Sequence, residues 1–330
     1  MKKIIAIMAL ALGLAACGGS EKAPTTYINI GTGGTAGTYY PLGGAFAEIW
    51  NTNIDGVNAT AESTGASVAN VNMLQKGDID VAIIQNDVAS YAENGVELFE
   101  NKVDNIRGMA TLYSEPIQCI TTDGSVKTIA DLKGKKVAIG AIGSGVYCNA
   151  VQILAEAGIT ESDYKPQYLS FAEAATGLRD RQIDAAFIVA GIPTSAIVDL
   201  ATQRDVKVVN LDKELADKLK AKYSYYTDYK IPGGTYSTQK DDAQTLTVQS
   251  MLVVSSKLSE DMVYNMLKTM YENTDRIKAA HKVGEFIKED TGLQGMSITL
   301  HPGAETVSYT HLDVYKRQGV GYVLKEKEKI

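Results

Sequence analysis

The hydrophobic positions of the chain follow a helical period after a glycine-rich turn. An apolar run near residues 28–30 leads into this turn, which is followed by Leu42, Ala45, Phe46, Ile49 and Trp50. These five positions fall on one face of a helix with 3.6 residues per turn. The pattern predicts a strand, a turn and an amphipathic helix that buries Phe46 and Trp50 in a core. A similar stripe in residues 260–276 predicts a second core-facing helix.

The same order of elements returns further along the chain. Residues 135–139 form a predicted strand with apolar residues at 137–139, residues 140–145 form a second Gly/Ser-rich turn, and Val146, Ala150, Val151 and Leu154 form a helical face. Two further matching segments, 74–85 and 178–189, each lead through a charged turn into a short apolar strand. Strand, helix and parallel strand form a right-handed crossover. We therefore expect two similar α/β lobes, each a mixed, mostly parallel sheet flanked by helices, with a ligand cleft between them.

Residues 1–26 read as an export signal and a tether. Lys2 and Lys3 precede an apolar run at residues 4–14 that is too short to span a bilayer, and Cys17 follows two alanines. This resembles a bacterial lipoprotein signal, in which residues 1–16 are removed and Cys17 carries the lipid. Residues 17–26 then form a flexible tether, which predicts an extracytoplasmic protein anchored by lipid to the bacterial cell membrane. An ordinary signal peptide with a chance cysteine is the alternative.

Charge and the rarer residue types exclude several classes of function. The formal charge of −7 over 330 residues predicts no general attraction to nucleic acid. Cys119 and Cys148 leave two alternatives open, one disulfide or two buried free thiols. The three histidines (His281, His301 and His311) show no metal-ligand spacing. We expect no metal, no cofactor and a monomeric protein.

The two glycine-rich turns suit a small anion. Backbone amides at a helix start, with hydroxyl groups beside them, attract a carboxylate. Neither turn carries the Gly-Lys-Ser/Thr of a nucleotide loop or a dinucleotide fingerprint. No histidine lies near either turn and no G-x-S-x-G elbow occurs, so the sequence favours binding over catalysis. A periplasmic hydrolase on a tandem α/β scaffold is the competing enzyme hypothesis.

A series of short motifs occurs in order along the chain. They are residues 31–43 (GTGGTAGTYYPLG), 63–70 (STGASVAN), 80–85 (DVAIIQ), 112–115 (LYSE), 131–135 (DLKGK), 140–145 (GAIGSG), 231–236 (IPGGTY) and 301–304 (HPGA). Together they resemble the TAXI family of solute receptors for TRAP transporters. The resemblance implies a two-lobed type II periplasmic-binding-protein fold without enzymatic activity. It also implies a small carboxylate ligand, such as glutamate, glutamine or 2-oxoglutarate, and delivery to TRAP permease membrane subunits.

Mapped onto this sequence, the resemblance implies ligand contacts from both lobes. They are Gly34, Thr35, Tyr39, Ser63, Thr64 and Gln85 in the first lobe, Ser144, Gly145, Val146, Gly191 and Pro193 in the second, and Tyr113 and Glu115 near the crossing strands. Glu115 is a candidate contact for an amino or hydroxyl group, with a solvated loop carboxylate as the alternative. A site of neutral amides and hydroxyls predicts that glutamine and glutamate compete closely.

The boundaries follow from the repeated pattern and the resemblance. Residues 27–123 and 245–305 are expected to form lobe I and residues 124–244 lobe II, with hinge segments at 121–127 and 238–246. Residues 306–330 resemble a translated adaptor sequence and are expected to pack poorly, unless they are a genuine lineage-specific tail. The tyrosine-rich residues 223–229 are a candidate ligand platform or the packed edge of a lobe. A ligand-sensing lipoprotein coupled to a membrane signalling partner is the alternative to transport.

Overall fold

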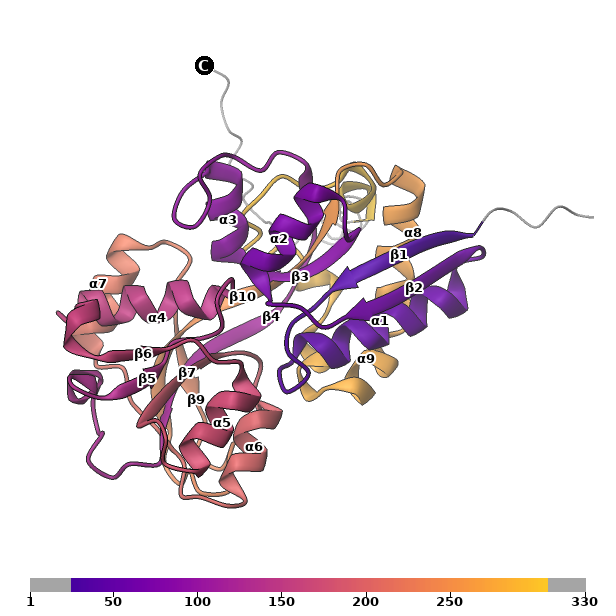
Figure 1. Ribbon diagram of the computed structural model, residues 1–330. Coiled ribbons are helices and arrows are strands. Elements are labelled where there is room, and N and C mark those ends of the chain that lie inside the picture. Colours follow the sequence, from indigo (N-terminus) through magenta and orange to yellow (C-terminus); the bar gives the residue numbers. More distant parts are fainter. Residues whose placement is uncertain (1–24, 308–330) are drawn as a thin grey trace, which may run out of the picture.

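The computed structural model describes residues 25–307, which form two lobes joined by two long strands (Figure 1). Lobe I begins with a strict alternation of strands and helices, in which β1 pairs in parallel with both β2 and β3. Its first elements are β1 (Thr26–Gly31), α1 (Tyr39–Asn53), β2 (Val57–Glu62), α2 (Ser67–Lys76), β3 (Val81–Gln85) and α3 (Asn86–Asn94).

Lobe II repeats this order, and β5 pairs in parallel with both β6 and β7. Its elements are β5 (Lys136–Ala138), α4 (Gly145–Glu156), β6 (Lys165–Gln167), α5 (Phe171–Arg179), β7 (Ala185–Val189), α6 (Ser195–Ala201), β8 (Lys207–Val208), α7 (Lys213–Lys222) and β9 (Thr227–Ile231), with short 3₁₀ turns η1 (Ile129–Leu132) and η2 (Glu161–Asp163). The two parallel units predicted from the repeated hydrophobic pattern are therefore confirmed.

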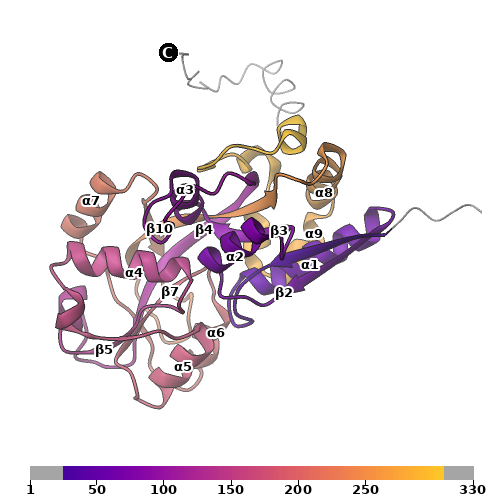
Figure 2. The same ribbon diagram turned by 45° about the horizontal axis from the view of Figure 1, so that its top comes forward.

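Two antiparallel strands, β4 (Ile106–Thr121) and β10 (Ala243–Ser255), pass from one lobe into the other (Figures 1 and 2). They complete one mixed sheet with the strand order β2-β1-β3-β10-β4-β7-β5-β6, while β8 pairs with β4 and β9 with β10. The parallel pairs lie within the lobes, whereas the pairs that involve β4 or β10 are antiparallel.

The crossing lies inside these strands and not in the expected hinge segments. In β4, Tyr113 packs in the core of lobe I and Ile117 in the core of lobe II. In β10, Val248 packs in lobe II and Met251 in lobe I. These positions come before residues 121–127 and after residues 238–246. The two strands are paired from Thr247 and Pro116 to Ser255 and Ile106, with a register shift at the crossing, between Gln249 and Met251. The lobe limits given above stay a prediction.

The C-terminal segment returns to lobe I. Residues 260–276 were expected to form one helix, but the structure divides them between α8 (Glu260–Glu272) and α9 (Thr274–Ala280), with Asn273 in a non-helical conformation. Short 3₁₀ turns η3 (Lys282–Phe286) and η4 (Glu289–Thr291) follow. Val263, Met266 and Met270 of α8 are buried in lobe I, as the helical stripe predicts.

Several predictions concern residues at the two ends of the chain. The signal peptide at residues 1–16, the lipidation site Cys17 and most of the tether lie outside the described residues. The expected tail begins at residue 306, yet Val307 is buried in the core of lobe I, and the remainder of the tail lies outside the described residues. Within residues 25–307, no helix has both the length and the hydropathy needed to cross a membrane.

Within the described residues, Cys119 and Cys148 are buried and free. Of the two alternatives left open by the sequence, the structure therefore shows two buried free thiols and no disulfide between them. Burial raises the pKa of the Cys119 thiol to about 12, and that of Cys148 also rises. Both thiols are therefore protonated at neutral pH and act as small apolar groups. Cys119 packs in the core of lobe II, and Cys148, although it belongs to α4 of lobe II, packs against core residues of lobe I.

The amphipathic face of α1 forms the centre of the lobe I core. Phe46 and Trp50 are fully buried and stack with ring centroids 6.0 Å apart, which confirms their predicted packing role. The indole Nε1 of Trp50 donates a hydrogen bond to the carbonyl oxygen of Met266 at 2.9 Å. This side chain therefore joins α1 to the returning helix α8.

Replacing Trp50 with alanine is expected to lower the free energy of unfolding by about 3–5 kcal/mol, because it leaves a large cavity and removes the hydrogen bond to the Met266 carbonyl oxygen. Tyr40→Ala on the same helix is the control, since Tyr40 is 38% exposed, and it is expected to change stability little. Urea denaturation measures both. Equal losses for the two variants would show that the α1–α8 contact does not anchor the core.

Candidate functional site

A pocket lies between the two lobes, where the ends of strands and the starts of helices meet. It contains about 640 Å³ of space between atoms, including its open mouth. Its lining comes from the turns before α1, α2, α4 and α5 and from the ends of β3 and β7 and the middle of β4. The lining residues are Gly33, Gly34, Gly37, Thr38, Tyr39, Thr64, Gly65, Ala66, Ser67, Gln85, Glu115, Ala141, Ser144, Gly145, Val146, Leu169, Ser170, Phe171, Val189 and Ala190.

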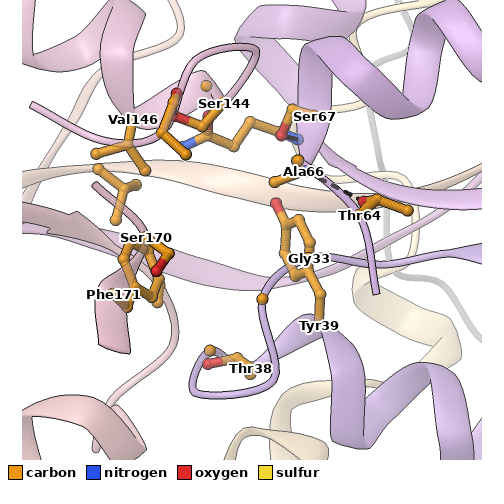
Figure 3. Close-up of a pocket in the computed structure, with 18 of the residues that line it drawn as sticks. Gly33, Thr38, Tyr39, Thr64, Ala66, Ser67, Ser144, Val146, Ser170 and Phe171 are labelled. Atoms are coloured by element: carbon orange, nitrogen blue, oxygen red, sulfur yellow. Dashed lines mark hydrogen bonds between the residues drawn. The ribbon is translucent and has the colours of Figure 1, made fainter. Parts of the chain in front are cut away.

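Figure 3 shows the two walls of this pocket. Tyr39, Thr64 and Ser67 of lobe I lie on one side, and Ser144, Val146 and Phe171 of lobe II lie on the other. The hydroxyl of Tyr39 points into the space between them. Each lobe therefore contributes part of the site, as expected for a cleft at the carboxyl ends of parallel strands.

The lobe I wall is held together by Asn70, a fully buried side chain of α2. Its Nδ2 donates to the carbonyl oxygens of Thr32 at 2.7 Å and Ile83 at 3.0 Å, and its Oδ1 accepts from the Thr64 hydroxyl at 2.6 Å. The ends of β1, β2 and β3 are thereby joined. A Cβ at Gly31 would lie 2.9 Å from Asn70 Oδ1 and 2.5 Å from Ile79 Cδ1, so a larger residue at this position would displace Asn70 or Ile79.

Main-chain groups connect the lobes at the rim of the pocket. The carbonyl oxygen of Gly143 in lobe II accepts hydrogen bonds from the amides of Val68 and Ala69 at the start of α2, both at 3.0 Å. No side chain caps α2, so this carbonyl satisfies two of its first amides. A second contact joins the amide of Ala196 in lobe II to the carbonyl of Ala36 at 3.3 Å.

Glu115 lies at the wall of the pocket and is fully buried. Its carboxyl accepts hydrogen bonds from the hydroxyls of Tyr39 at 2.8 Å and Tyr113 at 3.1 Å. Burial raises the pKa of Glu115 to about 8, although the two hydroxyls lower it. The carboxyl is therefore mostly protonated at neutral pH, in contrast to a solvated loop carboxylate.

The charge of the lining is otherwise close to neutral. Among the lining residues within 25–307, none is lysine, arginine or histidine. Serine and threonine hydroxyls, backbone amides and the side chains of Gln85 and Glu115 supply the polar groups. In the same part of the chain, no three His, Cys, Asp or Glu side chains are grouped to hold a metal ion.

The structure brings eight of the sequence-predicted contacts together at this pocket: Gly34, Tyr39, Thr64, Gln85, Glu115, Ser144, Gly145 and Val146. The other predicted contacts do not line it. Thr35 and Ser63 are exposed, and the Ser63 hydroxyl donates to the Gly33 carbonyl at 3.0 Å. Tyr113 lies behind Glu115, Gly191 is buried close to the Tyr113 ring, and Pro193 is half-buried nearby. Their roles toward a ligand stay predictions.

Sequence reasoning missed the contribution of the turn before α5, where Leu169, Ser170 and Phe171 line the pocket. Ser170 and Glu173 form a capping box, in which Ser170 Oγ accepts from the Glu173 amide at 3.4 Å and the Glu173 carboxylate accepts from the Ser170 amide at 2.8 Å. This turn follows β6, as the predicted contact Thr64 follows β2. The repeated pattern therefore contained the signal, in the form of Ser-x-x-Glu after the second strand of lobe II.

The tyrosine-rich segment at residues 223–229 does not line this pocket. Tyr226 packs in the lobe II core, and Tyr225 lies against Tyr91 with ring centroids 5.6 Å apart. The Tyr226 hydroxyl donates to Gln152 Oε1 at 2.6 Å, and Tyr91 and Tyr225 share a hydrogen bond between their hydroxyls. The segment therefore packs one lobe against the other beside the site.

The fold and the sequence are similar to known proteins. A Listeria monocytogenes protein described as an L-cystine ABC transporter shares 13% identity and a TM-score of 0.50, over 81% of this chain and 98% of that chain. A Xanthomonas citri protein bound to ATP shares 10% identity and a TM-score of 0.51, over 88% of this chain and 99% of that chain. The architecture is the two-lobed, type II fold of periplasmic binding proteins. The profile of the NMT1-like family matches residues 30–308, and the chain belongs to this family.

Proposed function

We propose that the protein is an extracytoplasmic solute-binding lipoprotein that captures a small carboxylate and delivers it to a TRAP-type membrane permease. Glutamate, glutamine or a related organic acid is the proposed ligand, and Cys17 the proposed site of the lipid anchor. The ordered motifs at residues 31–43, 140–145 and 301–304 support the TRAP assignment. The protein is proposed to release its ligand chemically unchanged.

The pocket between the lobes is the observation on which this proposal depends. The helices α1, α2, α4 and α5 all begin at its wall, and a helix start carries a partial positive charge. A carboxylate placed there is stabilised by amides and by the hydroxyl of Ser67, whereas the hydroxyls of Thr64 and Ser144 already donate to Asn70 Oδ1 and to the Ala141 carbonyl oxygen. This arrangement replaces the buried arginine that other carboxylate sites use.

The protonation of Glu115 makes the pocket compatible with an acid. An ionised carboxylate in this buried position would repel an anionic ligand, whereas a protonated carboxyl does not. If the ligand carries an ammonium group close to Glu115, the opposite charge favours ionisation of the carboxyl. The same side chain therefore suits an acid and an amino acid.

Binding without catalysis agrees with the chemistry of the lining. Its serine hydroxyls have no histidine among the lining residues to act as a general base. A ligand-sensing lipoprotein coupled to a membrane signalling partner would use the same pocket. Reconstitution with TRAP permease subunits separates the two functions, because only a transport receptor supports ligand uptake into vesicles.

The full chain is expected to be stabilised by its ligand. A compound at a hundred times its dissociation constant adds about 2.7 kcal/mol to the free energy of unfolding, which raises the melting temperature. A thermal-shift screen against amino acids, dicarboxylates and 2-oxo acids measures this rise, after unfolding and refolding to remove any carried-over ligand. A compound that is hydrolysed during the experiment would instead favour the enzyme hypothesis.

A substitution at Gly34 tests whether this pocket is the binding site. Gly34 lines the pocket and a Cβ added there meets no atom within 4 Å, so Gly34→Leu adds an apolar group to the wall without a clash at its Cβ. We expect affinity to fall roughly tenfold to a hundredfold, because the added side chain occupies ligand space. Gly124→Leu is the matched control, since its Cβ also meets open space, away from the lining. Equal ligand-titration curves for the two variants would show that the ligand binds outside this pocket.

The raised pKa of Glu115 predicts that the stability of the folded chain depends on pH. The folded chain keeps its Glu115 proton up to about pH 8, whereas the unfolded chain loses it near pH 4.5. Stability is therefore lost as the pH rises between these values, by up to about 1.4 kcal/mol per pH unit. Urea denaturation at pH 7 and pH 8 is expected to show this loss in the native chain and a smaller one in Glu115→Gln. Identical losses would mean that Glu115 is already ionised at neutral pH.

A further inference from the structure

Gln85 carries a buried oxygen without a hydrogen-bond partner. The residue ends β3, is 2% exposed and lines the pocket. Its Nε2 donates to Asn149 Oδ1 of lobe II at 3.0 Å, but its Oε1 finds no partner within residues 25–307. A buried unpaired acceptor is costly, so a site that keeps one is adapted to a donor from outside the chain.

The neighbours of Gln85 determine which end of its amide faces the pocket. Asn149 Nδ2 donates to Asp87 Oδ2 at 2.7 Å. An ionised carboxylate accepts hydrogen bonds and cannot donate them, so the NH₂ group of Asn149 must face Asp87. The Asn149 oxygen then faces Gln85 and fixes the Gln85 NH₂ group in turn. The Gln85 oxygen is left beside Gly145, which also lines the pocket.

Other contacts support the same orientation. The Tyr226 hydroxyl donates to Gln152, so it accepts from Asn149 Nδ2 at 3.0 Å. Burial raises the pKa of Asp87 to about 6, and the hydrogen bond from Asn149 lowers it, so the carboxyl is mostly ionised at neutral pH. Gly145 leaves room for the oxygen, since a Cβ at this position would lie 1.4 Å from Gln85 Oε1.

From this geometry we infer that Asp87 and Asn149 are positioning residues that hold the Gln85 oxygen toward the ligand, and that the pocket selects carboxylates bearing an N–H or O–H donor. The inference rests on the proposed function and narrows its ligand class. Amino acids and hydroxy acids carry such a donor beside the carboxylate. The corresponding 2-oxo acids present only acceptor oxygens, which leave Gln85 unpaired and place two oxygens against each other.

Isothermal titration of the full chain with L-glutamate, L-2-hydroxyglutarate and 2-oxoglutarate tests the selection. The three compounds share one carbon skeleton and differ in the group beside the carboxylate. We expect the amino and hydroxy acids to bind at least about tenfold more tightly than the 2-oxo acid. Binding of 2-oxoglutarate as tight as that of glutamate overturns the inference. Failure of all three to bind overturns the proposed carboxylate function itself.

Three variants test whether Asn149 positions the Gln85 amide or only stabilises the fold. Asn149→Leu lets the Gln85 amide rotate and present its NH₂ group, so the preference for glutamate over 2-oxoglutarate is expected to fall about tenfold. Gln118→Leu is the matched control, because it removes a buried amide of lobe II that bonds to Thr194 and Tyr236 and not to Gln85, Asn149 or Asp87, and it is expected to keep the preference. Gln85→Met keeps the hydrogen bond between Asn149 and Asp87 and removes the Gln85 amide. It is expected to lose the preference for glutamate over 2-oxoglutarate, and it tests the inference even if Asn149→Leu does not fold. A preference unchanged in folded Asn149→Leu or in Gln85→Met contradicts the inference.

Discussion

The pocket exists because β4 and β10 run from one hydrophobic core into the other and stay paired on both sides of the register shift at the crossing. Each strand places side chains in lobe I over part of its length and in lobe II over the rest. The parallel strands of the two lobes then direct their carboxyl ends, and the helices that follow them, toward one shared space. Glu115 lies on β4 close to the crossing, so the connection between the lobes also supplies part of the pocket wall.

Most of the fold could be predicted because its signals are local. A glycine-rich turn, an apolar strand and a helical stripe lie within a few dozen residues of each other, and they occur twice. The crossing positions could not be placed in the same way. They depend on which core surrounds Tyr113, Ile117 and Val248. Polar residues interrupt the apolar pattern of each strand there, but a strand that is buried on both faces does not show by its own sequence which core each segment enters. The break at Asn273 was likewise hidden inside a continuous helical pattern.

The candidate site was predictable where it coincides with turns, and less so where it depends on distant contacts. The family resemblance implied Gly34, Tyr39, Ser144 and Gly145, which lie in or directly after the two glycine-rich turns. Asn70 and Asn149 instead sit on helices as ordinary polar residues, and their importance comes from partners far along the chain. Asn70 reaches back to Thr32, and Asn149 of lobe II reaches Asp87 of lobe I. Asn70 and Asn149 do not line the pocket themselves, so their role is seen only in the folded structure, where they hold residues that do.

The contact between Gly143 and the start of α2 has a consequence for how such a protein changes over evolutionary time. Two amide groups and one carbonyl form it, and every residue type except proline supplies the same amide. Substitution of the side chains at positions 68 and 69 therefore leaves the contact itself in place, and only the left-handed backbone of Gly143, with φ of 82°, favours a particular residue. Side chains around the pocket can diverge toward new ligands while the lobes keep the same main-chain contact.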